Sequence, residues 1–113
     1  MATTLDAHTK SVLQQFLHSM EHEYEVAEAR LFGSRARGDH SPESDADLAI
    51  ILKGPRRPFL PVKHAMVDLA YDIMLETGLL ISPYPIWQEE WLDPQLSRNP
   101  ALLAEIAREG ISL

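Results

Sequence analysis

An unbroken apolar run, Leu48 to Leu52, sets the tightest limit on how this 113-residue chain can fold. A run of this length suits a strand and is far too short to span a membrane. A strand that is apolar at every position, rather than at every second one, is typical of a sheet that is covered on both faces. The run therefore predicts a buried strand over Asp47 to Leu52.

Helical and extended patterns alternate on either side of this strand. Apolar residues recur every three or four positions from Thr4 to His22 and from Val62 to Thr77, which predicts two amphipathic helices. The expected order is helix 4–22, strand 25–32, a turn into a short helix that Gly38 ends, strand 47–52, helix 62–77, extended segment 79–87, loop 93–100 and helix 101–108. This order predicts an α/β (α+β) fold, a small mixed β-sheet flanked by helices, in one domain over residues 1–113.

Two details of the later segments carry further expectations. Pro83 and Pro85 have no N–H to give to a ladder, so segment 79–87 should lie at a sheet edge or leave the sheet there. Trp87 and Trp91 are four residues apart, which suggests an apolar stripe on one short helix, either in the core or against a partner.

Composition excludes several classes of function. The chain has no cysteine, so disulfides, thiolate zinc sites and cysteine nucleophiles are excluded. Its first residues lack the basic and apolar regions of a signal peptide, and no apolar run is long enough to cross a membrane. We therefore expect a soluble, cytoplasmic protein.

Charge is unevenly distributed along the chain, which has a formal net charge of −7. Residues 30–63 hold seven basic and four acidic side chains, whereas the remainder holds three basic and thirteen acidic ones. An acidic surface argues against strong non-specific binding of nucleic acid, which requires many phosphates to be neutralised. A locally basic segment is better suited to a small polyphosphate such as a nucleoside triphosphate.

Two acids stand where the buried strand begins. Asp45 and Asp47 are two residues apart, so their side chains should project from the same face of the strand. Two close carboxylates repel each other unless a cation lies between them, and Mg²⁺ typically takes one or two carboxylates together with phosphate oxygens of a substrate. The spacing predicts Asp45 and Asp47 as metal ligands.

A second group of residues precedes the acids by ten positions. Gly33 and Ser34 stand where a strand should turn into a helix, and a glycine lets the backbone approach a phosphate closely. N–H groups at a helix start and the Ser34 hydroxyl are donors for a terminal phosphate, and Arg35 and Arg37 could add charge-assisted bonds. Asp-x-Asp and Gly-Ser are each common as caps and turns, but together they favour nucleotide binding by Gly33, Ser34, Arg35 and Arg37.

The stretch from Leu31 to Leu52 resembles the signature of the minimal nucleotidyltransferases in the DNA polymerase β-like superfamily. The resemblance implies a mixed sheet flanked by helices, two-metal Mg²⁺ chemistry and transfer of a nucleoside monophosphate with release of pyrophosphate. It implies that Asp45 and Asp47 bind metal and are the catalytic residues, while Gly33 and Ser34 hold the triphosphate of ATP. It further suggests a helical HEPN-type toxin as partner, whose tyrosine hydroxyl accepts AMP, with this chain as the antitoxin.

One element of the family pattern is missing. Active members usually supply a third carboxylate from a later strand, but the corresponding segment, Leu80 to Ile86, contains no acid. Acids near this segment are better explained as solvated side chains; they are Asp68, Asp72, Glu76, Glu89 and Glu90. Arg56 and Arg57 could reach a substrate from their loop. The alternative function is therefore a catalytically weak or inactive module that binds and occludes a partner protein. A homo-oligomer is the alternative to a HEPN-type partner.

Overall fold

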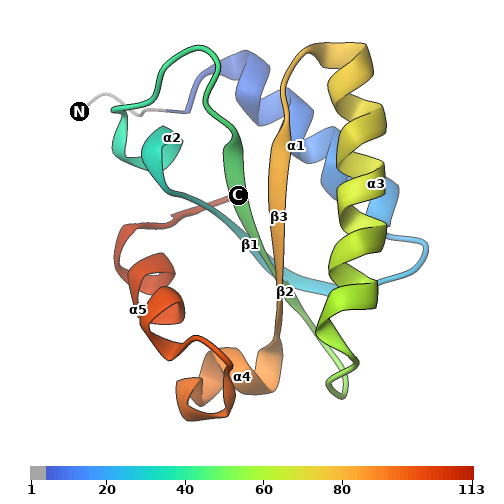
Figure 1. Cartoon of the computed structure of the whole chain (residues 1–113), viewed down its shortest axis with the longest axis vertical. Coiled ribbons are helices and arrows are strands. Elements are labelled where there is room, and N and C mark those ends of the chain that lie inside the picture. Colours follow the sequence, from blue (N-terminus) through green and yellow to red (C-terminus); the bar gives the residue numbers. More distant parts are fainter. Residues whose placement is uncertain (1–4) are drawn as a thin grey trace.

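The computed structural model describes residues 5–113, which form a four-stranded mixed sheet with helices on both faces (Figure 1). The strands are β1 (Val26–Phe32), β2 (Ala46–Leu52), β3 (Ile81–Trp87) and β4 (Ile111–Ser112). The helices are α1 (Ala7–Met20), α2 (Ser34–Arg37), α3 (Phe59–Thr77), α4 (Gln88–Leu92), α5 (Pro100–Glu109) and the 3-10 helix η1 (Pro94–Leu96). The expected fold class, a small mixed sheet flanked by helices, is confirmed.

Strand β2 is one of the two inner strands of the sheet, whose order is β3-β2-β1-β4. It runs antiparallel to β1 and parallel to β3, and β4 adds a short antiparallel pairing to β1 at Arg30 and Leu31. Every residue of β2 except Asp47 is buried. The predicted strand that is buried on both faces is therefore present, and its single polar position is one of the two acids.

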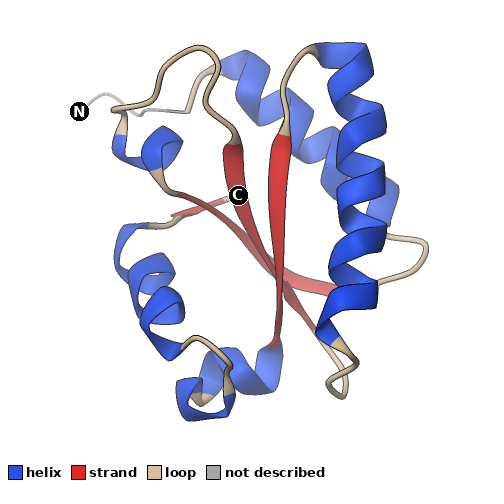
Figure 2. Ribbon diagram, in the orientation of Figure 1, coloured by secondary structure: helices blue, strands red, loops and turns tan. Residues whose placement is uncertain are grey.

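The sheet separates two apolar clusters. Leu48, Ile50 and Leu52 of β2 belong to the larger cluster, which α1 and α3 complete. Ala49 and Ile51 point to the other face, where Leu103 and Ile106 of α5 cover them. Figure 2 shows the resulting layers, with the two long helices on one side of the strands and the shorter helices on the other.

The helix ends follow ordinary capping chemistry. Asp6 caps α1 by accepting a 2.7 Å hydrogen bond from the Thr9 N–H, and the predicted start at Thr4 lies outside the described residues. Helix α3 begins at Phe59, earlier than the predicted Val62, because a proline in the first turn, Pro61, removes only an N–H that has no partner within the helix. None of the helices in residues 5–113 is long and apolar enough to cross a membrane.

Strand β3 lies at one edge of the sheet, as the two prolines in it predict. Trp87 is the last residue of β3, opposite Leu52, and is buried in the cluster with α1 and α3. Trp91 lies on α4 and packs against the other cluster. The expected Trp87–Trp91 stripe on one helix is therefore wrong, because the strand extends through Trp87 and the two rings lie in different clusters.

Candidate functional site

The bend between β1 and α2 brings Gly33 against Asp47. Phe32, the last residue of β1, pairs with Asp47 of β2 in the antiparallel ladder. Gly33 has φ 74°, a conformation that other residues adopt only with strain. A Cβ atom at Gly33 would collide with Asp47 Oδ2. The glycine is thus required twice, by the backbone conformation and by the carboxylate beside it.

Asp45 and Asp47 lie together at the start of β2. Ala46, between them, points into the cluster with α1 and α3, so the two acids belong to the opposite face, which α5 partly covers. Burial raises the pKa of the Asp47 carboxyl, and the nearby Asp45 carboxylate raises it further. Both effects disfavour the charged form, so a cation placed between the two carboxylates would relieve an existing electrostatic cost.

Helix α2 carries Ser34 at its first position, directly after the bend, and Arg37 at its last. It consists of one turn, which ends at Gly38 with φ 86° as the sequence predicts. The Arg37 guanidinium is half-exposed, and it pairs with Asp39 at 3.2 Å and with Glu109 at 3.4 Å. Its positive charge acts on Asp47 and partly opposes the rise in the pKa of that carboxyl. Arg37 is therefore within electrostatic reach of the position between the two acids.

Arg35 is placed differently from the other predicted nucleotide-binding residues. It is buried, and its Nε donates to the Ser44 carbonyl at 2.9 Å. Its terminal nitrogens donate to the Pro42 carbonyl at 3.4 Å and to Thr9 Oγ1 at 3.5 Å. These contacts are made with the loop that precedes Asp45 and with α1. The structure thus gives Arg35 the role of holding that loop and does not bring its guanidinium together with Asp45 and Asp47.

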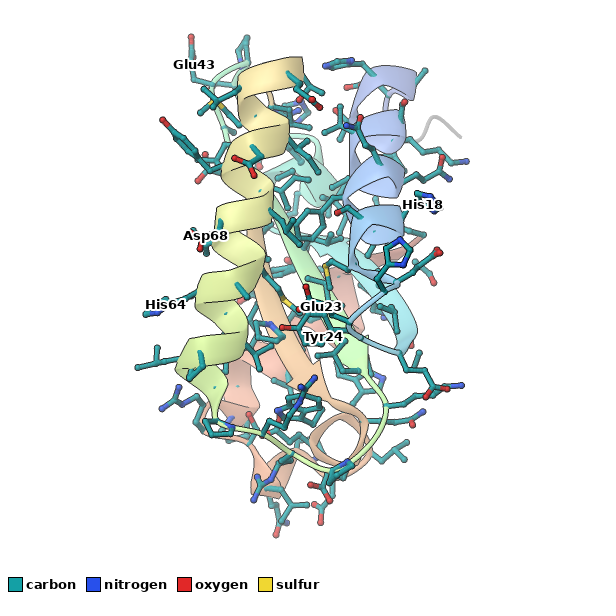
Figure 3. The ribbon with its side chains drawn as sticks, turned by 90° about the vertical axis from the view of Figure 1, so that its right-hand side faces the viewer. His18, Glu23, Tyr24, Glu43, His64 and Asp68 are labelled. Carbon is teal, nitrogen blue, oxygen red and sulfur yellow. The ribbon has the colours of Figure 1, made fainter. Side chains whose placement is uncertain are left out.

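Ser82 of β3, which carries a hydroxyl, lies opposite Asp47, where a third carboxylate would be expected from the family pattern. Ser82 of β3 pairs with Asp47 in the parallel ladder, so its side chain lies on the same face of the sheet. The acids of α3 are on the other side of the sheet, and Figure 3 shows Asp68 on the outer surface of that helix. Glu89 and Glu90 follow the far end of β3, where both pair with Arg56. Glu89 is exposed, as expected, but Glu90 is not a solvated acid, because its side chain is largely buried and accepts a 3.0 Å hydrogen bond from the Trp87 N–H at the start of α4.

Glu105 of α5 is an acid that the sequence analysis missed. It is half-buried, and its negative charge contributes to the raised pKa of Asp47. It follows the apolar pair Leu102 and Leu103 at helical spacing, which marks the border of the buried face of α5, but only the docking of α5 brings it toward Asp47. Within residues 5–113, no three histidine or acidic side chains are close enough together to hold a metal ion. A metal at this site would therefore need oxygen ligands from the substrate in addition to the Asp45 and Asp47 carboxylates.

Sequence comparison relates this chain to one domain family. Residues 13–107 match the model of the nucleotidyltransferase domain family. A protein of Methanocaldococcus jannaschii named "putative protein adenylyltransferase" is 43% identical over 53 residues, which are 47% of this chain and 52% of that protein. The alignment thus spans about half the length of that relative.

A solved structure, titled as that of a "putative nucleotidyltransferase" from Sulfolobus solfataricus, has a TM-score of 0.44 and 18% sequence identity to this chain. The alignment covers 93% of this chain and 75% of the other. The family match extends over most of the chain and includes the bend, both acids and most of α5. The chain therefore belongs to the nucleotidyltransferase domain family.

Proposed function

We propose that this nucleotidyltransferase transfers AMP from ATP to a hydroxyl acceptor, with Mg²⁺ held by Asp45 and Asp47. The observation that carries the proposal is the contact of Asp47 with Gly33 at the β1–α2 bend, with Asp45 on the same face. The adenylyl group is favoured because the curated relative is named as a protein adenylyltransferase.

The acids fit a hard divalent cation because both are carboxylates on one face and their charges raise the cost of leaving them unpaired. Bound Mg²⁺ would neutralise charge on the phosphates and on the attacking oxygen. The Ser34 hydroxyl and the Arg37 guanidinium are donors for the leaving phosphates. Arg35 serves this site indirectly, by holding the loop that leads into Asp45.

The reaction forms a bond between the acceptor oxygen and the α-phosphorus of ATP and breaks the bond from that phosphorus to the oxygen that bridges to the β-phosphate. Pyrophosphate leaves, and the proton of the acceptor hydroxyl passes to a carboxylate of the site or to water. Ser82 cannot take that proton as readily as a carboxylate, since a hydroxyl is a much weaker base. Glu105 is the nearest further acid that acts on Asp47 and is our candidate for this step.

A helical protein of the HEPN type is the proposed acceptor, with a tyrosine hydroxyl as the modified group and this chain acting as its antitoxin. An exposed apolar stripe on α3 supports a helical partner. Its members recur at intervals of seven and four residues and are 41% to 66% exposed; they are Leu60, Val67, Tyr71 and Leu75.

Calorimetric titration with ATP tests the binding half of the proposal. Affinity should depend on Mg²⁺ and should fall at least about tenfold in Asp45→Asn, the loss expected when one charged ligand is removed. Asp68→Asn, on the exposed side of α3, removes the same charge far from the site and should leave affinity unchanged. Affinity that is independent of Mg²⁺ or equal in Asp45→Asn would refute the metal assignment.

The second candidate function is a binding module that occludes its partner without chemistry. It is favoured by Ser82, which stands where an active enzyme would carry a third acid. Mass spectrometry of the co-expressed partner separates the two functions. Transfer predicts a gain of one adenylyl unit that disappears in Asp47→Asn, whereas occlusion predicts a stable complex and an unmodified partner with both chains.

A further inference from the structure

A cavity of 430 Å³ opens beside the edge strand β3, away from the β1–α2 bend. Its wall is formed by the β2–α3 loop, the start of α3, β3 and the segment before α5. The lining residues that matter here are cationic or aromatic; they are Arg56, Arg57, Arg98, Phe59, Tyr84 and Trp87. A cavity of this volume is of the size that binds small molecules.

Aromatic rings hold the cations in place. The Arg98 guanidinium carbon lies 4.6 Å from the centre of the Phe59 ring, and that of Arg57 lies 5.4 Å from the Trp87 ring. Lys63 does not line the cavity, but its ammonium lies 5.8 Å from the centre of the Tyr84 ring, which does. A guanidinium that stacks on a ring is oriented by it, while the N–H groups at its edge remain available to a ligand.

Two of the three arginines that line the cavity, Arg57 and Arg98, are not paired with a carboxylate of the described residues, although Glu90 also lines it. Arg56 pairs with Glu89 and Glu90, but across residues 5–113 no acidic side chain forms an ion pair with Arg57, Lys63 or Arg98. The protein as a whole is acidic, with a net charge of −7, so unpaired cations gathered on one cavity stand out from the rest of its surface. Their mutual repulsion would be relieved by an anion bound among them.

We propose that this cavity is a binding site for a phosphate monoester, held by Arg57 and Arg98 and distinct from the site at Asp45 and Asp47. A monoester is nearly a dianion at neutral pH, with three terminal oxygens that can accept from the guanidinium forks of Arg57 and Arg98. A carboxylate offers less charge and fewer oxygens to the same donors. The site does not depend on the transfer reaction, so it can be tested without ATP.

Calorimetric titration of the full chain with glycerol 2-phosphate is the test. Saturable binding is expected, with an affinity about tenfold weaker in Arg57→Gln and in Arg98→Gln, the loss expected for a charge-assisted hydrogen bond. Arg108→Gln removes an exposed guanidinium outside the cavity, so its affinity should stay within about twofold of that of the native chain. A twofold change corresponds to less free energy than one hydrogen bond contributes. Arg98→Lys keeps the charge but loses the fork, so its affinity should fall between those of the native chain and Arg98→Gln.

Several results would overturn the assignment. These are absence of saturable binding, equal affinity for succinate, native affinity in Arg98→Gln, or the same loss in Arg108→Gln. Binding that is lost in Ser34→Ala but retained in Arg57→Gln would place the phosphate at the β1–α2 bend and leave the proposed transferase function intact. Circular dichroism and thermal unfolding of each variant show whether a loss of binding comes from a loss of fold. If Arg98→Gln does not fold, the affinity of Arg98→Lys is the deciding measurement, and native affinity in that variant would overturn the assignment.

Discussion

Asp47 combines partial burial with a like charge beside it, and both raise the pKa of its carboxyl above 3.8. Because the folded state then holds its proton more tightly than the unfolded state, stability falls as pH rises through the interval between 3.8 and the raised value. Above that interval the cost of the charged Asp47 is fully present, and well below it the cost is absent. Carboxyl groups with a perturbed pKa are common at functional sites.

Replacement of Asp47 by asparagine should therefore stabilise the protein without ligand at neutral pH. The melting temperature of Asp47→Asn should exceed that of the native chain by a few degrees at pH 7, and the difference should vanish near pH 3, where the native side chain is protonated as well. Thermal unfolding followed by circular dichroism measures both values. Asp68→Asn serves as the control, and a lower melting temperature for Asp47→Asn at pH 7 would contradict the argument.

Gly33 allows a second prediction at the scale of one residue. Gly33→Ala places a Cβ against Asp47 Oδ2 in a backbone conformation with positive φ, and should cost about 2–4 kcal/mol. Gly54→Ala has a similar φ of 91° but no atom within 4 Å of the added Cβ, and should cost only about 1–2 kcal/mol. Denaturant unfolding measures both values. Adding Asp47→Ala to Gly33→Ala should recover part of the loss, and no recovery would show that the collision is not with Asp47.

At the scale of elements, the docking of α5 matters most for the site, because this helix brings Glu105 toward Asp47. Removing that charge should lower the pKa of Asp47. In a carbon-detected NMR titration, Glu105→Gln should shift the midpoint of Asp47 downward, as expected when a like charge near the carboxyl is removed. Glu76→Gln, on α3 across the sheet, should leave the midpoint unchanged. An unchanged midpoint in Glu105→Gln would mean that α5 does not hold the acid near Asp47.

Elements were predictable wherever local chemistry decides them. The apolar run specified β2, Gly38 and Gly78 ended their helices, and the prolines of β3 indicated an edge strand. The two-residue strand β4 was missed because Ile111 and Ser112 carry no pattern of their own and pair only because β1 offers an open edge. The position of Glu105 was missed for a related reason, since helical spacing does not reveal which neighbour a helix docks against.

For the molecule as a whole, the ordering of the strands explains why the bend and both acids could be inferred from one short stretch. β1 and β2 are adjacent and antiparallel, so the end of one lies beside the start of the other, and the intervening loop has only to cover that short gap. What sequence spacing did not reveal is the direction of each arginine of α2. The charge of Arg37 acts on Asp47, whereas the Arg35 guanidinium points toward α1, although only Ala36 separates the two residues.

The buried guanidinium of Arg35 has a consequence for the number of residues that separate Ser34 from Asp45. Its three hydrogen bonds join α1 to the loop before β2. A shorter or longer connection would break these bonds and leave the buried guanidinium without partners. An uncompensated internal charge costs about 3–5 kcal/mol, a large share of what a domain of this size has to hold it together. The contacts of Arg35 therefore explain why ten residues separate Ser34 from Asp45.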